Sequence, residues 1–242
     1  MSVISEDIKK ICDALIKLKE GTRIIKGKKY PIEYIAKLSL NSDISKWDYN
    51  NPVLIILDAV LTINRNYLTF VKPRVLSFKE NYDEIKTIEQ MLNLIQTLGF
   101  DKFSKEVLKY NDMERILLLK RVLTEFKNYK IENNLQDDLE ALKHWAQNID
   151  IKKLKTDKIY NIKGIGLSTV QYLRMLIGVN TMMPDRHIKS WVMEILGVDK
   201  LGEKKYIKFL EQVSEILGIP CKEIVEYIWA LKNPKIPDLE KE

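Results

Sequence analysis

Apolar residues recur along this chain at the three- and four-residue spacing of amphipathic helices, and the alternation typical of strands is nearly absent. Clear stripes run over residues 8–18 and 85–98, and each stops shortly before a glycine. Pro52 opens a further helix, which we expect to reach about Tyr67, because proline fits a first helical turn. Other helices are predicted at about 101–109, 112–127, 136–149, 151–160, 167–177, 185–196, 203–217 and 221–231.

The predicted fold class is therefore all-α. A short extended piece near Thr22–Tyr30 is the exception, and no internal repeat or low-complexity linker interrupts the pattern. The chain has 242 residues, of which 45% are hydrophobic, so it can bury a sizeable core. We expect one compact helical unit over residues 1–242.

Composition limits the classes of function. Lys and Arg number 40 against 34 acidic residues, a formal charge of +6 that suits phosphate backbones but also occurs in many other proteins. Cys12 and Cys221 lie far apart without ligand spacing, which disfavours a zinc site, a four-cysteine iron–sulfur cluster and a disulfide framework. Residues 1–10 lack the apolar stretch of a secretory signal, and the apolar run 53–61 is too short to span a bilayer. We therefore expect a soluble, intracellular protein.

The most informative segment is a glycine turn, residues 162–166, with the sequence Ile-Lys-Gly-Ile-Gly. Gly164 and Gly166 lack Cβ, so they allow a sharp turn with exposed amides, while Ile165 can anchor the turn in the core. The next helix starts directly afterwards, and its dipole favours an anion such as a phosphate at that end. Five lysines surround the turn, namely Lys152, Lys153, Lys155, Lys158 and Lys163. Taken alone, the same pattern also fits a plain helix cap and turn.

A second segment follows, in which Pro184 and Asp185 start another amphipathic helix nineteen residues after Gly166. Asp185 can be an ordinary N-cap, a role in which aspartate is favoured. An N-cap carboxylate held by backbone amides is also a fixed, ionised group, so a structural and a chemical role are compatible. His187, one of two histidines, can contact phosphate or form a surface hydrogen bond.

Together, the glycine turn and the Pro-Asp helix resemble the signature of the helix-hairpin-helix DNA glycosylases, the HhH-GPD superfamily. That superfamily includes endonuclease III, the adenine glycosylase of A·G mispairs, and the thymine-mismatch, 8-oxoguanine and alkyladenine glycosylases. Residues 51–64 are similar to its first barrel helix. Asn64 stands where the family often has an amide side chain that fills the space left by a flipped base.

This resemblance implies an architecture and a chemistry. The architecture is a two-lobed helical bundle, with a barrel lobe at 50–195, its hairpin at 151–178, and a second lobe from 1–45 plus 197–242. The chemistry is hydrolysis of the N-glycosidic bond of a damaged or mispaired base that has been flipped out of duplex DNA. Asp185 would stabilise the oxocarbenium-like sugar and orient the attacking water.

Ser168 stands two residues after Gly166, where bifunctional members carry the lysine that forms a Schiff base. A hydroxyl cannot form that imine, so we expect a monofunctional glycosylase, with lyase action by another lysine as the alternative. The substrate stays open, because Ser168 is similar to the adenine branch whereas Pro184-Asp185 and Ile188-Lys189 are similar to the alkyladenine branch. Lys163 departs from the proline that the family commonly has there. Two further alternatives are a non-catalytic lesion-binding protein and a helical interaction domain with a chance Gly-x-Gly turn.

The resemblance also implies binding residues and partners. The expected DNA contacts are Lys163, Gly164, Ile165, Gly166, Ser168, Thr169, Asn64, Arg186, His187 and Lys189. Tyr67 and Trp47 are the expected base-pocket aromatics. The backbone of Ile162, Gly164 and Ile165 would hold a monovalent cation, Na+ or K+, with no required cofactor and no iron–sulfur cluster. The expected partner is double-stranded DNA with a lesion or mismatch; we expect a monomer that binds no membrane and, in a prokaryote, a cytoplasmic protein associated with the nucleoid.

Overall fold

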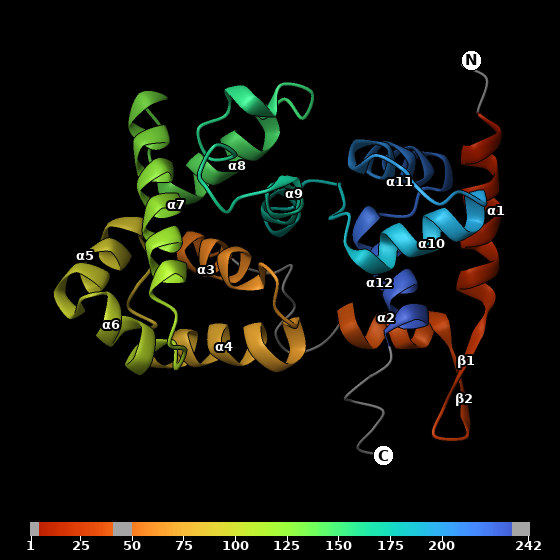
Figure 1. Ribbon diagram of the computed structural model, residues 1–242, viewed down its shortest axis with the longest axis horizontal. Helices are drawn as coiled ribbons and strands as arrows, with labels where there is room; N and C mark the ends of the chain where they lie inside the picture. The colour runs from red at the N-terminus through yellow and green to blue at the C-terminus, as the bar shows by residue number, and fades with distance from the viewer. Residues whose placement is uncertain (1–4, 41–49, 234–242) are drawn as a thin grey trace. The chain divides into compact units, whose positions relative to one another are not determined.

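The computed structural model describes residues 5–40 and 50–233 (Figure 1). The chain divides into two compact units. We call Trp47–Val179 the central unit, and Met1–Lys46 with Asn180–Glu242 the terminal unit. Both are mostly helical, as predicted. The boundary after Val179 places the helix that follows Asp185 in the terminal unit, whereas the predicted barrel lobe extended to 195.

The terminal unit consists of five helices and one β-hairpin among its described residues. The apolar stripe of its first helix is buried and ends at Gly21, as the sequence predicts. Helix α2 lies against α12, and α1 contacts α10 and α11. The elements are α1 (Glu6–Glu20), β1 (Thr22–Ile25), β2 (Lys28–Pro31), α2 (Ile32–Leu40), α10 (Arg186–Leu196), α11 (Glu203–Leu217) and α12 (Cys221–Lys232).

The central unit is built around helix α3, which contacts α4, α7 and α9 (Figure 1). Every residue of α3 from Pro52 to Leu61 is buried, and a helix that is apolar on all sides is typical of a core. The elements are α3 (Pro52–Thr62), η1 (Tyr67–Val71), α4 (Lys72–Asn81), α5 (Ile88–Leu98), α6 (Phe100–Lys102), η2 (Phe103–Val107), α7 (Met113–Glu132), α8 (Asp138–Asn148), η3 (Leu154–Thr156) and α9 (Leu167–Leu176).

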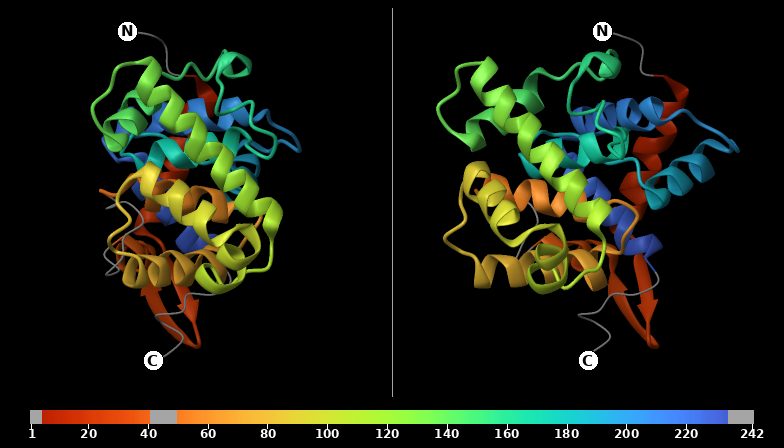
Figure 2. Two further views of the ribbon diagram at one scale, coloured as in Figure 1. Left: turned by 90° about the vertical axis from the view of Figure 1, so that its left-hand side faces the viewer. Right: turned by 60° about the vertical axis from the view of Figure 1, so that its left-hand side comes forward.

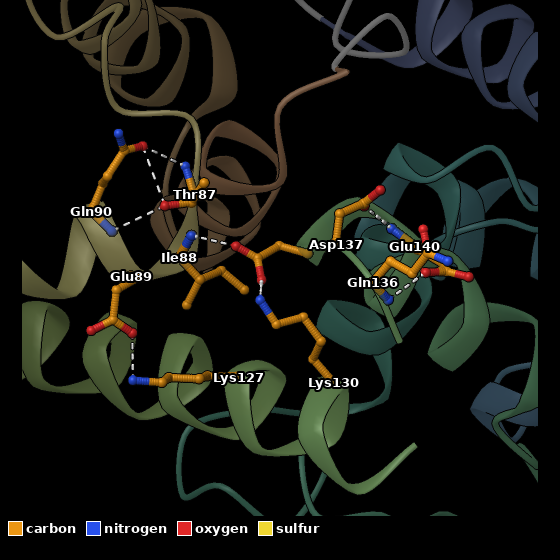
Figure 3. A network of polar contacts seen from close by, with 10 residues as sticks. Thr87, Ile88, Glu89, Gln90, Lys127, Lys130, Gln136, Asp137 and Glu140 are labelled. Carbon is orange, nitrogen blue, oxygen red and sulfur yellow. Dashed lines mark hydrogen bonds and ion pairs between the residues drawn. The ribbon is translucent and has the colours of Figure 1, made fainter. Parts of the chain in front are cut away.

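A polar network joins the starts of α5 and α8 to α7 (Figure 3). Thr87 and Gln90 form a reciprocal capping box at the start of α5. The carboxylate of Asp138 is only 5% exposed; it accepts a hydrogen bond from the amide of Ile88 at 2.7 Å and an ion pair from Lys130 at 2.5 Å. One buried acid therefore connects three helices.

Two predicted helices of the central unit differ from the structure. Residues 151–160 form turns and the short η3 instead of an α-helix. Asp150 accepts from the amide of Lys152 at 2.8 Å and Asp157 from that of Tyr160 at 2.7 Å, and such local bonds compete with a helix. The helix expected at 52–67 ends at Thr62, because Asn64 adopts a left-handed conformation with φ 56°.

The remaining predictions differ mainly at their boundaries. The helix expected at 101–109 is the short α6 followed by η2, and the one expected at 112–127 continues to Glu132. The extended piece near Thr22–Tyr30 is confirmed as the hairpin β1–β2, while α2 was not predicted. Within the described ranges, no helix has the length and apolar character needed to cross a membrane.

Cys12 and Cys221 are buried, unpaired thiols of the terminal unit. Burial raises the pKa of the Cys221 thiol to about 11. Burial, with a smaller contribution from the charge of Asp13, also raises the pKa of Cys12. Both side chains are therefore protonated near neutral pH and shielded from reagents in solution.

Candidate nucleic-acid interface

The glycine turn folds tightly, and its geometry requires glycine at one position. The amide of Ile165 donates to the carbonyl of Ile162 at 2.9 Å, which closes the turn. Gly164 has φ +105°, and a Cβ added there would lie 3.2 Å from Cδ2 of Leu118. Ile165 is only 8% exposed and anchors the turn in the core, as expected, while Gly164 and Gly166 are exposed.

Helix α9 starts directly after this turn without a side-chain cap. Its N-cap, Gly166, has extended backbone angles (φ −116°, ψ 177°) and, as a glycine, provides no side-chain cap. The amides of that first turn point out of the helix end, where they favour an anion. Of the two predicted contacts in that first turn, Ser168 is half-buried and Thr169 is only 8% exposed.

An open hollow of about 270 Å³ lies between α7 and the glycine turn, within the central unit. It combines three cationic side chains with one acid, and its lining is Lys120, Arg121, Thr124, Glu125, Ile162 and Lys163. The ammonium group of Lys120 lies 5.4 Å from the ring centre of Phe100. The hollow thus brings Lys120 and Arg121, two cations that the sequence analysis did not identify, to the basic surroundings of the turn.

Not all of the predicted cations are equally available to a phosphate. Lys158 forms an ion pair with Glu132 at 2.6 Å, and that hydrogen bond raises the pKa of the lysine. Lys189 pairs with Glu203 at 2.5 Å. Lys163, in contrast, is exposed beside the hollow. A phosphate at Lys158 or Lys189 would have to displace an existing carboxylate.

Asp185 is the N-cap of α10 in the terminal unit, as predicted. Its Oδ1 accepts hydrogen bonds from the amides of His187 and Ile188, both at 2.9 Å. The side chain is half-buried, and among the described residues no donor reaches its Oδ2. Neighbouring Arg186 is exposed and its guanidinium lies 3.3 Å from Nε2 of His187. One carboxylate oxygen is therefore fixed by the backbone while the other is available.

The loop after α3 presents Asn64 to solvent on a well-held backbone. Arg65 donates to the carbonyl of Asn64 at 3.2 Å and to the hydroxyl of Tyr110 at 2.6 Å. Its guanidinium lies 5.5 Å from the ring centres of both Phe70 and Tyr110. Asn64 itself is exposed in its left-handed conformation. The residue predicted to fill the space of a flipped base is thus exposed, on a loop whose backbone contacts Arg65.

Of the two aromatic residues predicted for the base pocket, the structure describes Tyr67. Tyr67 is half-buried and its hydroxyl donates to the buried carboxylate of Asp58 at 3.4 Å. Tyr172 also donates to Asp58, at 2.9 Å. Trp47, the other predicted base-pocket aromatic, lies outside the described residues. The sequence offered a signal for Asp58, because it is the single charge within the apolar run of α3.

The Ile162, Gly164 and Ile165 backbone has the right chemistry for the expected monovalent cation, because carbonyl oxygens suit hard ions. The Ile162 carbonyl already accepts from the Ile165 amide, so one of its lone pairs remains for a cation. Among the described residues, no cluster of His, Cys, Asp or Glu could hold a metal ion.

Comparison with known proteins gives a family match. DUF8548, a domain of unknown function, matches residues 37–233, a span that contains the glycine turn and Asp185 but not α1 or the β-hairpin. No curated protein matches the chain, and no solved structure does. The matched span covers most of the 242 residues. The chain therefore belongs to the DUF8548 family.

Proposed function

We propose that this protein is a monofunctional DNA glycosylase that hydrolyses the N-glycosidic bond of a damaged or mispaired base in duplex DNA. The proposal starts from the resemblance of residues 162–190 to the helix-hairpin-helix glycosylases. The observation that carries it is the local structure of the two motifs. The glycine turn leaves a helix start uncapped, and Asp185 is a carboxylate with one oxygen fixed and the other available.

The uncapped start of α9 supports a phosphate contact. Backbone amides, the helix dipole and exposed glycine at Gly164 and Gly166 together favour an oxyanion that approaches closely. Lys163 and the hollow with Lys120 and Arg121 add positive charge on the same unit. These contacts would hold the DNA backbone without regard to sequence, as a repair enzyme that scans for rare lesions requires.

Asp185 supports the chemical step. Loss of a base leaves positive charge on the sugar, and a fixed carboxylate stabilises that charge more effectively than a mobile one. Two amide donors keep Oδ1 in place, and Oδ2 can face the sugar or accept a proton from water. Pro184 is buried just before it and restricts the backbone further.

Ser168 supports hydrolysis without strand cleavage. Its side chain follows Gly166 at the position of the lysine that forms an imine in bifunctional enzymes, and a hydroxyl cannot form one. A monovalent cation at the carbonyls of Ile162, Gly164 and Ile165 would add positive charge beside a bound phosphate. The chain would supply only backbone oxygens to it.

The test uses duplexes that each carry one lesion: uracil, hypoxanthine, 8-oxoguanine, an alkylated adenine, or A or T opposite G. Each reaction is split, and half is treated with hot alkali, which cleaves only at abasic sites. We expect cleavage after alkali alone, and its loss in Asp185→Asn. Asparagine is an equally good N-cap, so this variant should fold.

The matched control is Asp137→Asn, the same chemical change at the N-cap of α8. It should excise bases at the wild-type rate. Equal activity of Asp185→Asn and the wild type would contradict the proposed role of Asp185. Cleavage without alkali, together with a borohydride-trapped adduct, would show that a lysine acts as the nucleophile after all.

A second candidate is a lesion-binding protein without catalysis. One observation favours it: capping of α10 is by itself a sufficient reason for Asp185. This candidate predicts that no duplex is cleaved after alkali, that duplex binding persists, and that Asp185→Asn binds as the wild type does.

A further inference from the structure

The β-hairpin of the terminal unit is a short, tight ribbon whose tip is well defined. Strands β1 and β2 pair with Arg23 opposite Tyr30 and Ile24 opposite Lys29. Lys26 and Gly27 connect them with φ values of 48° and 81°. Two positive φ values in a two-residue connection are typical of a type I′ turn, whose twist matches that of the strands.

The ribbon is strongly basic. Residues 22–31 contain Arg23, Lys26, Lys28 and Lys29 and no acidic residue. The three lysines are exposed. Cations at this density, without acids among them, are typical of surfaces that meet a row of phosphates.

The base of the ribbon is fixed to the helices. The guanidinium of Arg23 donates to the carbonyl of Ala230 in α12 at 2.6 Å, and the amide of Ile32 donates to the carbonyl of Gly21 at 3.0 Å. Tyr30 stacks on Tyr34 of α2 with ring centres 6.2 Å apart. From this base the two strands extend away from the helices of their unit (Figure 2). The tip is thus held out on a rigid support, which lowers the entropy lost on binding.

Ile24 is the most exposed large apolar side chain among the described residues. It is 71% exposed, and its cross-strand partner is Lys29, so both project from one face. An aliphatic side chain this exposed is stabilised when a partner covers it. Beside lysines, the surface complementary to this face combines anionic and apolar groups.

We infer that the β-hairpin is a second DNA-binding element, which contacts phosphates through Lys26, Lys28 and Lys29 and places Ile24 against the duplex groove. The major groove of B-DNA admits a two-stranded ribbon, and it offers rows of phosphates at its edges and the apolar methyl groups of thymine among the polar base edges. An anionic membrane fits less well, because a single exposed isoleucine gives little apolar area to insert. The inference rests on the proposed function only in taking duplex DNA as the partner.

The experiment compares two triple variants of the full chain in binding to an undamaged, fluorescein-labelled duplex by anisotropy. Lys26→Asn/Lys28→Gln/Lys29→Gln neutralises the tip, and asparagine suits the left-handed position of residue 26. Lys9→Gln/Lys10→Gln/Lys17→Gln removes three exposed lysines of α1 and is the matched control. Both variants lower the formal charge of +6 by three.

Binding is measured from about 50 to about 200 mM salt. We expect the hairpin variant to bind about tenfold or more weakly, and the slope of log K against log salt to become shallower by about 2.7, the value for three phosphates. The α1 variant should change this slope by less than about 0.9, the value for one phosphate. Ile24→Thr, which keeps a β-branched residue in the strand, should weaken binding severalfold at an unchanged slope. Circular dichroism checks that every variant is folded.

The outcomes separate this inference from the proposed function. If the wild type binds duplex DNA but both triple variants lose the same affinity, only net charge matters and the inference is wrong. The proposed base excision is then still decided by its separate cleavage test. If the hairpin variant alone loses affinity although no lesion is excised, the inference holds and the glycosylase proposal fails. If the wild type binds no duplex, both fail. A last outcome concerns membranes. If the wild type sediments with phosphatidylserine vesicles and the hairpin variant does not, while both bind DNA equally, the hairpin binds membranes and the inference is wrong.

Discussion

Helices α5 and α9 of the central unit start in opposite ways. At α5, Thr87 and Gln90 satisfy each other's amides and Asp138 accepts from the amide of Ile88, so three backbone donors have partners within the chain (Figure 3). At α9, Gly166 provides no side chain and no cap bond. Helices α3, α7 and α8 resemble α5, with caps from Asn51, Asp112 and Asp137. Helices α4, α11 and α12 also start without a side-chain cap, so what distinguishes the start of α9 is the exposed Gly166 and the basic hollow beside the glycine turn.

The largest expected loss of stability comes from removing the buried acceptor at the capped start of α5. Asp138→Ala leaves the amide of Ile88 and the ammonium of Lys130 without their acceptor in a buried place. We expect a loss of about 3 kcal/mol in the free energy of unfolding, measured in urea. Glu89→Ala, which removes the exposed partner of Lys127 in the same network, should change it little. Similar losses in the two variants would show that burial of Asp138 is not the cause.

Gly164→Ala tests the turn that precedes the uncapped start. A residue with Cβ is strained at φ +105°, and Leu118 stands 3.2 Å from the new atom. We expect a loss of about 2 kcal/mol in unfolding free energy and weaker duplex binding. Gly166→Ala is the control, because its φ of −116° suits any residue and a Cβ there meets open space. The turn geometry would be refuted as a requirement by equal stability of the two variants.

Thr87→Ala removes one half of the capping box. The amide of Gln90 then loses its acceptor at 3.2 Å, and we expect the unfolding free energy to fall by about 1 kcal/mol. Duplex affinity of the folded protein should stay at the wild-type value, because this helix start has no external partner in the proposal. A parallel loss of affinity would mean that the start of α5 also meets DNA.

Gly166→Asp converts the uncapped start into a capped one. The backbone already has the extended angles of an N-cap, so we expect stability to rise by a few tenths of a kcal/mol. The new carboxylate occupies the amides and repels phosphate, so duplex affinity should fall at low salt. Gly166→Ser would give the cap without the charge. Unchanged affinity in both variants would exclude the α9 start as a phosphate site.

The smallest effect concerns acid stability at the start of α7. The hydrogen bond from the Tyr110 hydroxyl, at 2.6 Å, holds the pKa of Asp112 below 3.8, with smaller help from the Arg115 amide. A depressed pKa in the folded state contributes stability that is present above 3.8 and is lost as the pH falls through the folded value. Asp112→Asn should therefore lose less stability than the wild type between about pH 6 and about pH 3 in urea titrations. The same acid dependence in both proteins would show that Asp112 does not cause it.

Local signals explain what the sequence predicted well. The helix of Arg186–Leu196 has a proline, an N-cap aspartate and a glycine stop, so its position and the cap at Asp185 followed from neighbouring residues. The glycine turn was likewise recognisable, because two glycines on either side of one isoleucine allow a sharp turn between helices. The helix predicted at 151–160 was wrong. The prediction followed the helical spacing of apolar residues and gave too little weight to Asp150 and Asp157, whose side chains form turns.

Long-range contacts explain what the sequence could not give. Lys120 and Arg121 are ordinary exposed residues of an amphipathic helix, and only folding brings them to Ile162 and Lys163. Arg65 reaches Tyr110, which is 45 residues away, to hold the Asn64 loop. No local pattern encodes such pairs, whereas each member of a cap or turn lies within a few residues of its partner.

The two buried thiols have a practical consequence for experiments on this protein. Because Cys12 and Cys221 are shielded, and the pKa of Cys221 lies at about 11, neither should react quickly with a maleimide dye near neutral pH. A single cysteine introduced at an exposed position, such as Lys28→Cys at the hairpin, would then be labelled selectively in the natural background. We therefore expect the natural chain to serve as a cysteine-free scaffold for labelling, in which a dye at the ribbon reports DNA contact directly.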